Sequence, residues 1–456
     1  MEDILTHEGE ADERREKFQA FIDERNFREA KNFLSTLNVV DIANLIDGLD
    51  PQTGVALYRM LPKDVAAEVF AKFDPEQQEA IIYASTDTEI RELIEDMFLD
   101  DTVDLLEEMP SGVVSRILEN TGHSDRSMIN QLLKYPDSSA GSIMTTEYIS
   151  LKKEMTVSSA IDKIKREGIQ SETIYILYVT DENRILEGIL SLRDLIVADD
   201  SKRVGELMRE DVIYAYTLDD KEEVANIFKK YSFEALPIVD QEKRIVGIVT
   251  VDDILDVIEE EVTEDFQIMA ATTPTDKPYL ETGIFALSKH RILWLLILMI
   301  SATITQKIIY NYENILQNVT FLSGFIPMLM DTGGNSGSQS STLIIRGLAT
   351  GDIKSRDWYR VVFKEVRVAM VCGLALAVIN YFKIYLDGIP SNVALVVSLT
   401  LVCAVMIAKI VGAILPMVAI KIKVDPAIMA SPLITTIADA LSLMVYFIIA
   451  RNIMSI

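Results

Sequence analysis

Cysteine and histidine are scarce in this chain of 456 residues, and their scarcity excludes several kinds of site. The two cysteines, Cys372 and Cys403, both lie in apolar runs, so no disulfide framework is expected. The three histidines are far apart in sequence, which argues against zinc, copper and di-metal hydrolase sites. Neither a nucleophile–histidine pair nor a phosphate-binding P-loop is evident. We therefore predict a protein that is not an enzyme and has no catalytic residues.

Basic residues are too few in the first 284 residues to suggest a nucleic-acid partner. That part has 29 Lys and Arg against 62 Asp and Glu, whereas residues 285–456 have 14 against 8. Phosphate binding needs clustered Lys and Arg, so nucleic acid is excluded as a partner. An acidic surface either attracts cations or aids solubility. The acidic, polar N-terminal sequence is unlike a signal peptide and is expected to stay in the cytosol.

Long apolar runs are confined to the C-terminal part and predict a membrane domain at 289–456. Five of them approach the ~20 residues that a spanning helix needs. They are Ile292–Tyr310, Val319–Ile345, Val366–Tyr385, Val393–Ile420 and Ala427–Ala450. Lys and Arg concentrate before the first run, between the second and third, and between the fourth and fifth. The positive-inside rule then predicts a multi-pass protein in membrane lipid, with its N-terminus cytoplasmic and its C-terminus extracytoplasmic.

Residues Met144–Ile258 contain an internal duplication. The sequence GILSLRDLI at Gly188–Ile196 recurs as GIVTVDDIL at Gly247–Leu255. Each copy follows a helical pattern and a strand-like run, so the order strand, helix, strand, strand, helix is expected twice. This pattern resembles tandem CBS (cystathionine-β-synthase-like) domains, an α/β pair that we place at 138–200 and 201–258.

The segment 1–137 has the pattern of short amphipathic helices punctuated by proline. Pro51, Pro62, Pro75 and Pro110 lie at or near the first turns of the expected helices, where the missing amide is tolerated. An all-α, superhelical and acidic N domain is therefore predicted. A polar linker (plug) helix at 259–288 is expected to join the soluble domains to the five-helix membrane domain.

The second apolar run is interrupted by the polar stretch PMLMDTGGNSGSQSSTLIIRG. Such a stretch is tolerated where a membrane helix lines a water-filled path or packs closely on another helix. Asp331, Asn335 and Gln339 recur every four residues, so their oxygens should lie along one face. An ion path and a helix–helix packing seam are both compatible with this pattern.

The fifth apolar run carries an intramembrane acid. Asp425, Pro432 and Asp439 are spaced by seven, which predicts one shared helix face with Asp439 about 21 Å deeper than Asp425. A carboxylate within a bilayer is costly unless it is paired or hydrated. A buried ion pair with Lys409 is the alternative to cation coordination. The available oxygen ligands suit hard ions such as Mg²⁺, although Ca²⁺ and Mn²⁺ share this chemistry.

The chain as a whole resembles the MgtE family of Mg²⁺ channels and transporters. The most specific motifs are PMLMDTGGNSGSQ, STLIIRGLATGD and VDPAIMASPLITTIAD. The resemblance implies a homodimer in the cell (inner) membrane, with the second and fifth spans of both copies lining one pore. It further implies that Asp439 holds the hydrated ion and that Asp425 belongs to the cytosolic gate region.

The resemblance also implies regulatory Mg²⁺ sites made of carboxylates in the soluble part and linker. Repulsion among these acids should separate the ion-free domains, and bound Mg²⁺ should favour the compact state. Any single one of them is equally compatible with solvated surface, and Ser232 stands where another acid would be expected. The implicated acids are Glu68, Asp100, Asp104, Glu222, Asp253, Asp256, Glu261, Glu264 and Asp265.

CBS pairs often bind adenine nucleotides, and the resemblance implies possible ATP binding at Arg193, Asp194, Phe233 and Asp253. A purely structural role for the aspartates is the alternative. The predicted function is Mg²⁺-selective uptake by a channel or transporter that closes when Mg²⁺ binds the acidic N and CBS domains. A broader transporter of Co²⁺, Mn²⁺ or Ca²⁺ is one alternative. A non-conducting, membrane-anchored CBS sensor is another.

Overall fold

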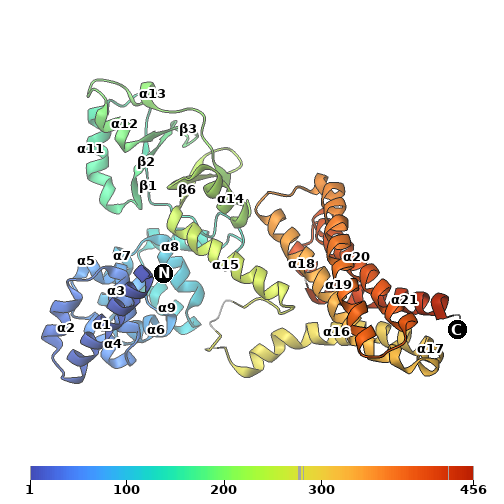
Figure 1. Cartoon of the computed structure of the whole chain (residues 1–456). Helices are drawn as coiled ribbons and strands as arrows, with labels where there is room; N and C mark the ends of the chain where they lie inside the picture. The colour runs from blue at the N-terminus through green and yellow to red at the C-terminus, as the bar shows by residue number, and fades with distance from the viewer. Residues whose placement is uncertain (1, 276–278, 281, 430, 455–456) are drawn as a thin grey trace. The chain divides into compact units, whose positions relative to one another are not determined.

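The computed structural model describes residues 2–275, 279–280, 282–429 and 431–454 (Figure 1). The chain divides into two compact units, Met1–Ile258 and Glu259–Ile456, and each is described by itself. Four residues of the predicted linker, 276–278 and 281, lie outside the described part.

The first unit begins with a stack of short helices, as predicted. Pro51 and Pro75 are the first residues of α4 and α6, and Pro62 and Pro110 are the N-caps of α5 and α9. Helices two apart in sequence pack together, which gives a superhelical stack around an apolar interior. The helices are α1 (Glu2–Asp23), α2 (Phe27–Leu34), α3 (Val39–Asp47), α4 (Pro51–Tyr58), α5 (Lys63–Ala71), α6 (Pro75–Ala84), α7 (Asp87–Asp96), α8 (Leu99–Glu108), α9 (Ser111–Asn120) and α10 (His123–Leu132).

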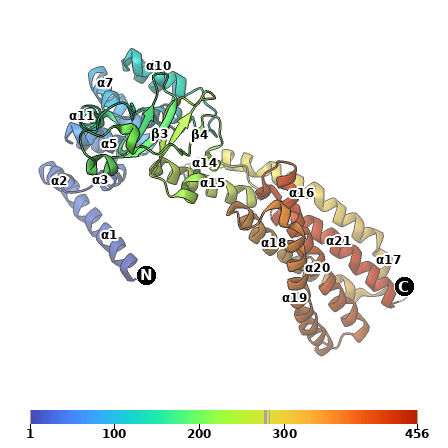
Figure 2. The ribbon, with the colours of Figure 1, turned by 90° about the horizontal axis from the view of Figure 1, so that it is seen from above.

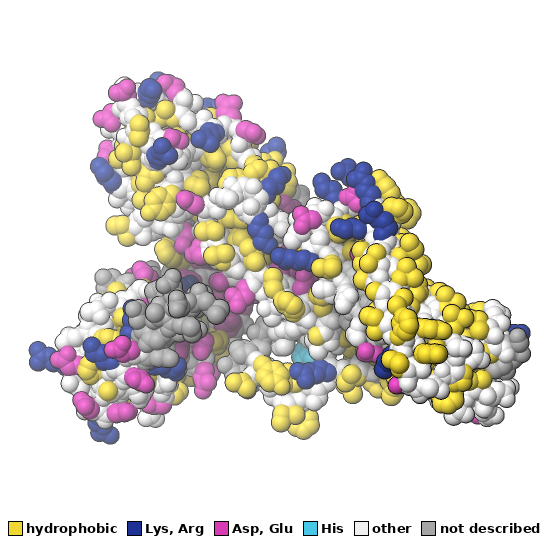
Figure 3. All heavy atoms as spheres, viewed as in Figure 1, with side chains coloured by type: hydrophobic (Ala, Val, Ile, Leu, Met, Phe, Trp, Pro, Cys, Tyr) yellow, Lys and Arg dark blue, Asp and Glu magenta, His cyan; other side chains and the backbone are white. Residues whose placement is uncertain are grey.

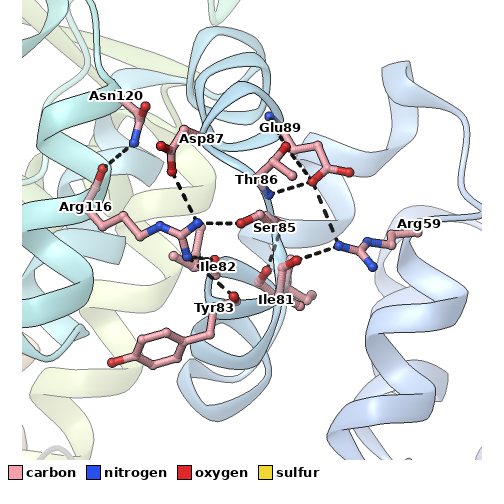
Figure 4. Close-up of polar contacts among 11 residues, drawn as sticks. Arg59, Ile81, Ile82, Tyr83, Ser85, Thr86, Asp87, Glu89, Arg116 and Asn120 are labelled. Atoms are coloured by element: carbon pink, nitrogen blue, oxygen red, sulfur yellow. Dashed lines mark hydrogen bonds and ion pairs between the residues drawn. The ribbon is translucent and has the colours of Figure 1, made fainter.

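The turn between α6 and α7 is fixed by two arginines (Figure 4). Arg116 of α9 donates to the carbonyl oxygen of Ile82 at 2.7 Å and to that of Ser85 at 2.5 Å. Arg59, the residue after α4, donates to the carbonyl oxygen of Ala84 at 2.6 Å. The last carbonyls of a helix lack partners within the helix, so these guanidinium groups satisfy them and hold successive helices together.

Two similar modules complete the first unit and confirm the predicted α/β duplication. Each has a three-stranded sheet in which the first two strands are parallel and the last two antiparallel. The first module comprises β1 (Tyr148–Leu151), α11 (Val157–Glu167), β2 (Thr173–Thr180), β3 (Leu186–Ser191), α12 (Leu192–Val197) and α13 (Val204–Leu207). The second comprises β4 (Ala215–Tyr216), α14 (Lys221–Tyr231), β5 (Ala235–Val239), β6 (Ile245–Thr250) and the start of α15 (Val251–Met269).

The two modules exchange backbone hydrogen bonds at their entrances. Thr145, which precedes β1 of the first module, pairs with Ile248 in β6 of the second through bonds of 2.9 and 2.8 Å. Arg209, which precedes β4 of the second module, pairs with Ile189 in β3 of the first through bonds of 3.0 and 2.9 Å. This reciprocal pairing joins the duplicated modules into one folded pair.

The second unit is helical, and α18, α19, α20 and α21 lie side by side in both ribbon views (Figures 1 and 2). Its surface in Figure 3 is largely hydrophobic, with Lys and Arg gathered at one end of α18 and α19. After α15 its elements are α16 (Ile284–Asn311), α17 (Glu313–Asn318), η2 (Thr320–Phe325), α18 (Ile326–Ala349), η3 (Ser355–Asp357), α19 (Trp358–Leu386), α20 (Ser391–Lys421), η4 (Pro426–Met429) and α21 (Ser431–Met454).

Three helical segments among the described residues are long and apolar enough to cross a membrane: Ile284–Asn311, Ser391–Lys421 and Pro426–Met454. Helices α18 and α19 have 24 and 29 residues but carry more polar and charged side chains. A total of five spans, and the orientation of the termini, therefore stay predictions.

The expectation that Asp425 and Asp439 share one helix is wrong. Asp425 precedes the short 3₁₀ helix η4, and α21 begins only at Ser431. The depth of 21 Å assumed an unbroken α-helix between the two residues, so it does not apply. Asp425 accepts a hydrogen bond from the amide of Ala427 at 2.7 Å, which favours a turn at this point.

Candidate functional site: a polar membrane helix and an acidic cluster

One face of helix α18 carries polar side chains that the rest of the chain leaves uncovered. Asp331, Asn335 and Gln339 are all exposed, in agreement with their predicted position on one helix face. Polar groups at membrane depth need water or another protein surface, because lipid tails offer no hydrogen bonds. This face is therefore a candidate lining for an aqueous path.

A different side of α18 is a close packing seam. Gly333, Gly334 and Gly337 are buried there. A Cβ atom on Gly412 of α20 would lie 2.3 Å from the carbonyl oxygen of Gly337, so only glycine permits this backbone contact. The prediction of a packing seam thus applies to the glycine side of α18, and the polar face is still a candidate lining for an ion path.

Helix α21 places Asp439 beside the polar helix. Its Oδ1 atom lies 3.8 Å from the position that a Cβ atom on Gly334 would occupy, and the charge of Asp331 acts on the same carboxylate. Oδ1 is buried and has no hydrogen-bond partner in the described part of the chain. A carboxylate in this state is costly unless water or a cation meets it.

The alternative of an Asp439–Lys409 ion pair is wrong. Lys409 of α20 instead lies 3.8 Å from Oε2 of Glu365 on α19, and both side chains are nearly fully buried. Its Nζ also donates to the hydroxyl of Ser340 at 3.2 Å. Glu365 was not foreseen as the partner, because it follows Lys364 and precedes Arg367 in a segment that looks like the charged end of a span.

A cluster of carboxylates lies in the first unit, between the helical stack and the CBS-like pair. Burial, and then the charge of Asp253, raises the pKa of Asp100 on α8 well above its ordinary value. Loss of solvent, with the charges of Asp101 and Asp253, raises the pKa of Asp104 to about 7, although one side of Asp104 stays open. Burial also raises the pKa of Asp253, against hydrogen bonds from Thr250. The predicted acids Asp100, Asp104 and Asp253 are thus brought together.

Sequence reasoning missed further members of this cluster. Burial raises the pKa of Glu147 to about 7, although the amide of Leu99 donates to its carboxylate at 3.1 Å. Burial and the charges of Asp253 and Asp252 raise the pKa of Glu172 to about 7. Glu147 and Glu172 are isolated in sequence and gave no signal. Asp252 adjoins a predicted acid, so its neighbourhood could have suggested it.

The other predicted regulatory acids are more dispersed. Glu68 lines a cavity of about 1070 Å³ together with Asp101 and Glu147. Glu222 on α14 and Asp256 on α15 are exposed. Within the described residues, no three His, Cys, Asp or Glu side chains are close enough to hold a metal ion by themselves. The remaining acids, Glu261, Glu264 and Asp265, lie farther along α15, in the second unit.

Three of the four predicted nucleotide-binding residues make contacts within the CBS-like pair. Asp194 follows the N-cap Ser191, whose hydroxyl accepts from the Asp194 amide at 3.1 Å, and neighbouring Arg193 is exposed. Phe233 stacks on Tyr231 with ring centroids 5.3 Å apart. The fourth residue, Asp253, accepts hydrogen bonds from Thr250. Of the two aspartates, Asp253 takes part through its carboxylate and Asp194 through its backbone amide, and nucleotide binding at these residues stays a prediction.

An acidic helical domain and a CBS pair, joined to a helical membrane unit with a polar helix, define a membrane transporter for cations with an attached helical domain and CBS pair. The models of three families match: "Divalent cation transporter" over residues 326–449, "MgtE intracellular N domain" over 37–138, and "CBS domain" over 140–201 and 204–260. The magnesium transporter MgtE of Thermus thermophilus is 39% identical over 95% of this chain and 97% of its own length. The chain belongs to the MgtE family.

Two solved structures resemble the soluble part. The crystal structure of the soluble part of a magnesium transporter has a TM-score of 0.51 and 31% identity, and covers 55% of this chain and 99% of its own. The cytosolic domain of the Mg²⁺ channel MgtE in complex with ATP has a TM-score of 0.50 and 38% identity, and covers 53% of this chain and 98% of its own. They support the helical domain and CBS pair described above.

Proposed function

We propose that this chain carries Mg²⁺ into the cytosol along a path formed by α18 and α21, and that it is not an enzyme. The observation that carries the proposal is the carboxylate of Asp439, half-buried in an apolar helix with Oδ1 unpaired within the described chain. Lys409, the cation that would have neutralised it, is neutralised by Glu365 instead. The charge of Asp439 is therefore available to a passing cation.

Two copies of the chain would complete the path as a homodimer. Asp331, Asn335 and Gln339 are uncovered in one chain, and their polar groups are costly against lipid. A second copy facing them would enclose a water-filled path and bring two Asp439 carboxylates to one ion. Mg²⁺ keeps most of its hydration water and uses few carboxylates, so outer-shell contacts from two aspartates fit it.

Mg²⁺ bound to the acidic soluble part is proposed to close the path, in a protein of the cell (inner) membrane. Burial raises the pKa values of Asp100, Asp104, Asp253, Glu147 and Glu172, and repulsion from nearby carboxylates raises them further. A divalent cation relieves this repulsion and stabilises the compact arrangement. The predicted acids elsewhere, including Asp425 at the gate and those along α15, would extend the sensor. ATP, which is bound in the structure of the related cytosolic domain, is a further proposed ligand, and we place it at the CBS pair.

Uptake of Mg²⁺ into proteoliposomes with a fluorescent Mg²⁺ indicator tests this function. Asp439→Asn should reduce uptake by more than about tenfold, because the neutral amide no longer balances the ion's charge. Asp387→Asn makes the same chemical change at an exposed loop position and is the matched control. Uptake by Asp439→Asn at the native rate would contradict the proposal.

Competition experiments separate the alternative functions. In the same vesicles, Co²⁺, Mn²⁺ and Ca²⁺ should enter much more slowly than Mg²⁺; equal rates would favour the broader divalent transporter. A native chain that conducts no ion, yet becomes more stable when Mg²⁺ binds, would favour the non-conducting sensor.

A further inference from the structure

A buried polar triad joins three helices of the second unit. Glu365 on α19, Lys409 on α20 and Ser340 on α18 meet there. The Ser340 hydroxyl donates to Oε2 of Glu365 at 2.5 Å and accepts from Nζ of Lys409 at 3.2 Å. The side chains of Lys409 and Glu365 are only 6% and 14% exposed. Neither charged residue lies on α18 or α21, the two helices of the proposed ion path.

The triad is placed where it can fix the rotation of α18. Successive residues of an α-helix are turned by about 100°, so Asn335 and Asp331, five and nine residues before Ser340, lie on the far side of the helix. Anchoring Ser340 therefore fixes the rotation of α18 and the direction of its polar face, whose Asn335 and Gln339 border a cavity that α19 and α20 also line. The contact between Gly337 of α18 and Gly412 of α20 lies about one turn from the triad and allows these two helices to approach closely.

The charge of the triad also reaches the polar face. A cavity of about 1330 Å³ is lined by Asn335 and Gln339 of that face and also by Glu365 and Lys409, together with the charged residues Asp352, Asp357, Arg360 and Lys364. With both charges present the pair is neutral. Without Glu365, an uncompensated ammonium would border the hollow and repel cations from it. Removing one partner of a buried ion pair is also much more disruptive than removing both.

We infer that Glu365 is a positioning residue for cation transport, which neutralises Lys409 and, through Ser340, holds the polar face of α18 toward the ion path. This inference rests on the proposed function. It assigns a role to a residue that never touches the ion.

Three variants in the Mg²⁺ uptake assay test the inference. Glu365→Gln should lower uptake by roughly tenfold or more, because it leaves Lys409 charged and unpaired. The double variant Glu365→Gln/Lys409→Met removes both charges and should recover uptake to within about threefold of native. Lys409→Met alone should be impaired more than the double variant. Glu313→Gln, the same substitution at an exposed site, should transport normally.

A second measurement follows the accessibility of the polar face to water and does not depend on ion flux. Asn335→Cys is introduced after Cys372 and Cys403 are changed to Ser, and its modification by a water-soluble maleimide is timed. Glu365→Gln should change this rate several-fold, and the added Lys409→Met should restore it. Native uptake in Glu365→Gln, a double variant no better than the single one, or an unchanged labelling rate would overturn the inference. If the native chain carried no Mg²⁺, the proposed function would fail, while the labelling result would still decide the role of Glu365.

Discussion

The sulfur of Met144 lies 2.8 Å from the position that a Cβ atom would take on Gly247, and the sulfur of Met208 stands in the same relation to Gly188. Each methionine precedes the first strand of one CBS module and packs against the glycine of the other module's last strand. The repeated Gly and Met positions of the sequence therefore form two equivalent contacts, Met144 with Gly247 and Met208 with Gly188. Met is flexible, but the nearby carbonyl oxygens of Thr145 and Arg209 also limit the space.

Gly247→Ala should destabilise the soluble unit by about 1–3 kcal/mol, because a methyl group is forced into a filled space. The backbone oxygen of Thr145 would lie only 2.7 Å from the new Cβ atom. Thermal unfolding of the purified chain, followed by circular dichroism, measures the effect. Gly112→Ala is the control, since its Cβ would meet only the hydroxyl of Tyr83 at 3.9 Å. A Gly247→Ala chain as stable as the control would refute the packing argument.

The stability gained from Mg²⁺ should increase with pH. The pKa values of Asp104, Glu147 and Glu172 are raised to about 7, so the ion-free fold is favoured while they are protonated. That contribution is lost as the pH rises from their ordinary values near 4 through 7. Mg²⁺ needs the ionised carboxylates and must displace protons at low pH.

Thermal unfolding with and without Mg²⁺, at about pH 5 and about pH 8, tests this pH dependence. The Mg²⁺-induced rise in unfolding temperature should be large at the higher pH and small at the lower. An equal rise at both values would show that these carboxylates do not bind the ion.

Neutralising the cluster should uncouple transport from internal Mg²⁺. Asp100→Asn/Asp253→Asn removes two mutually repelling charges, so the ion-free soluble unit should become more stable and Mg²⁺ should stabilise it less. In vesicles preloaded with Mg²⁺ on the cytosolic side, this variant should continue to conduct when the native chain has stopped. Asp162→Asn, at an exposed position of α11, should close normally. Normal closure of the double variant would remove these acids from the sensor.

Local sequence patterns predicted the helices and strands of this protein better than they predicted which polar side chains meet. Proline at helix starts and the repeated GILSLRDLI and GIVTVDDIL motifs are local signals, and the structure bears them out. The partner of Lys409 depends on how three helices pack, and Glu365 is 44 positions away in sequence. Glu147 and Glu172 likewise approach α8 and α15 only through tertiary folding. The 3₁₀ helix η4 after Asp425 was missed because Asp425 and Asp439 happen to fit an α-helical spacing.

The seam between α18 and α20 should tolerate no side chain at Gly412. A Cβ atom there would lie 2.3 Å from the carbonyl oxygen of Gly337, and backbone in the middle of two packed helices cannot retreat cheaply. Gly412→Ala should therefore destabilise the membrane unit by roughly 2 kcal/mol or more and lower Mg²⁺ uptake, since the helices must separate. Aggregation temperature in detergent measures the stability. Gly324→Ala, where a Cβ atom meets nothing within 4 Å, is the matched control. A Gly412→Ala chain with native stability and uptake would mean that α18 and α20 do not touch at these glycines.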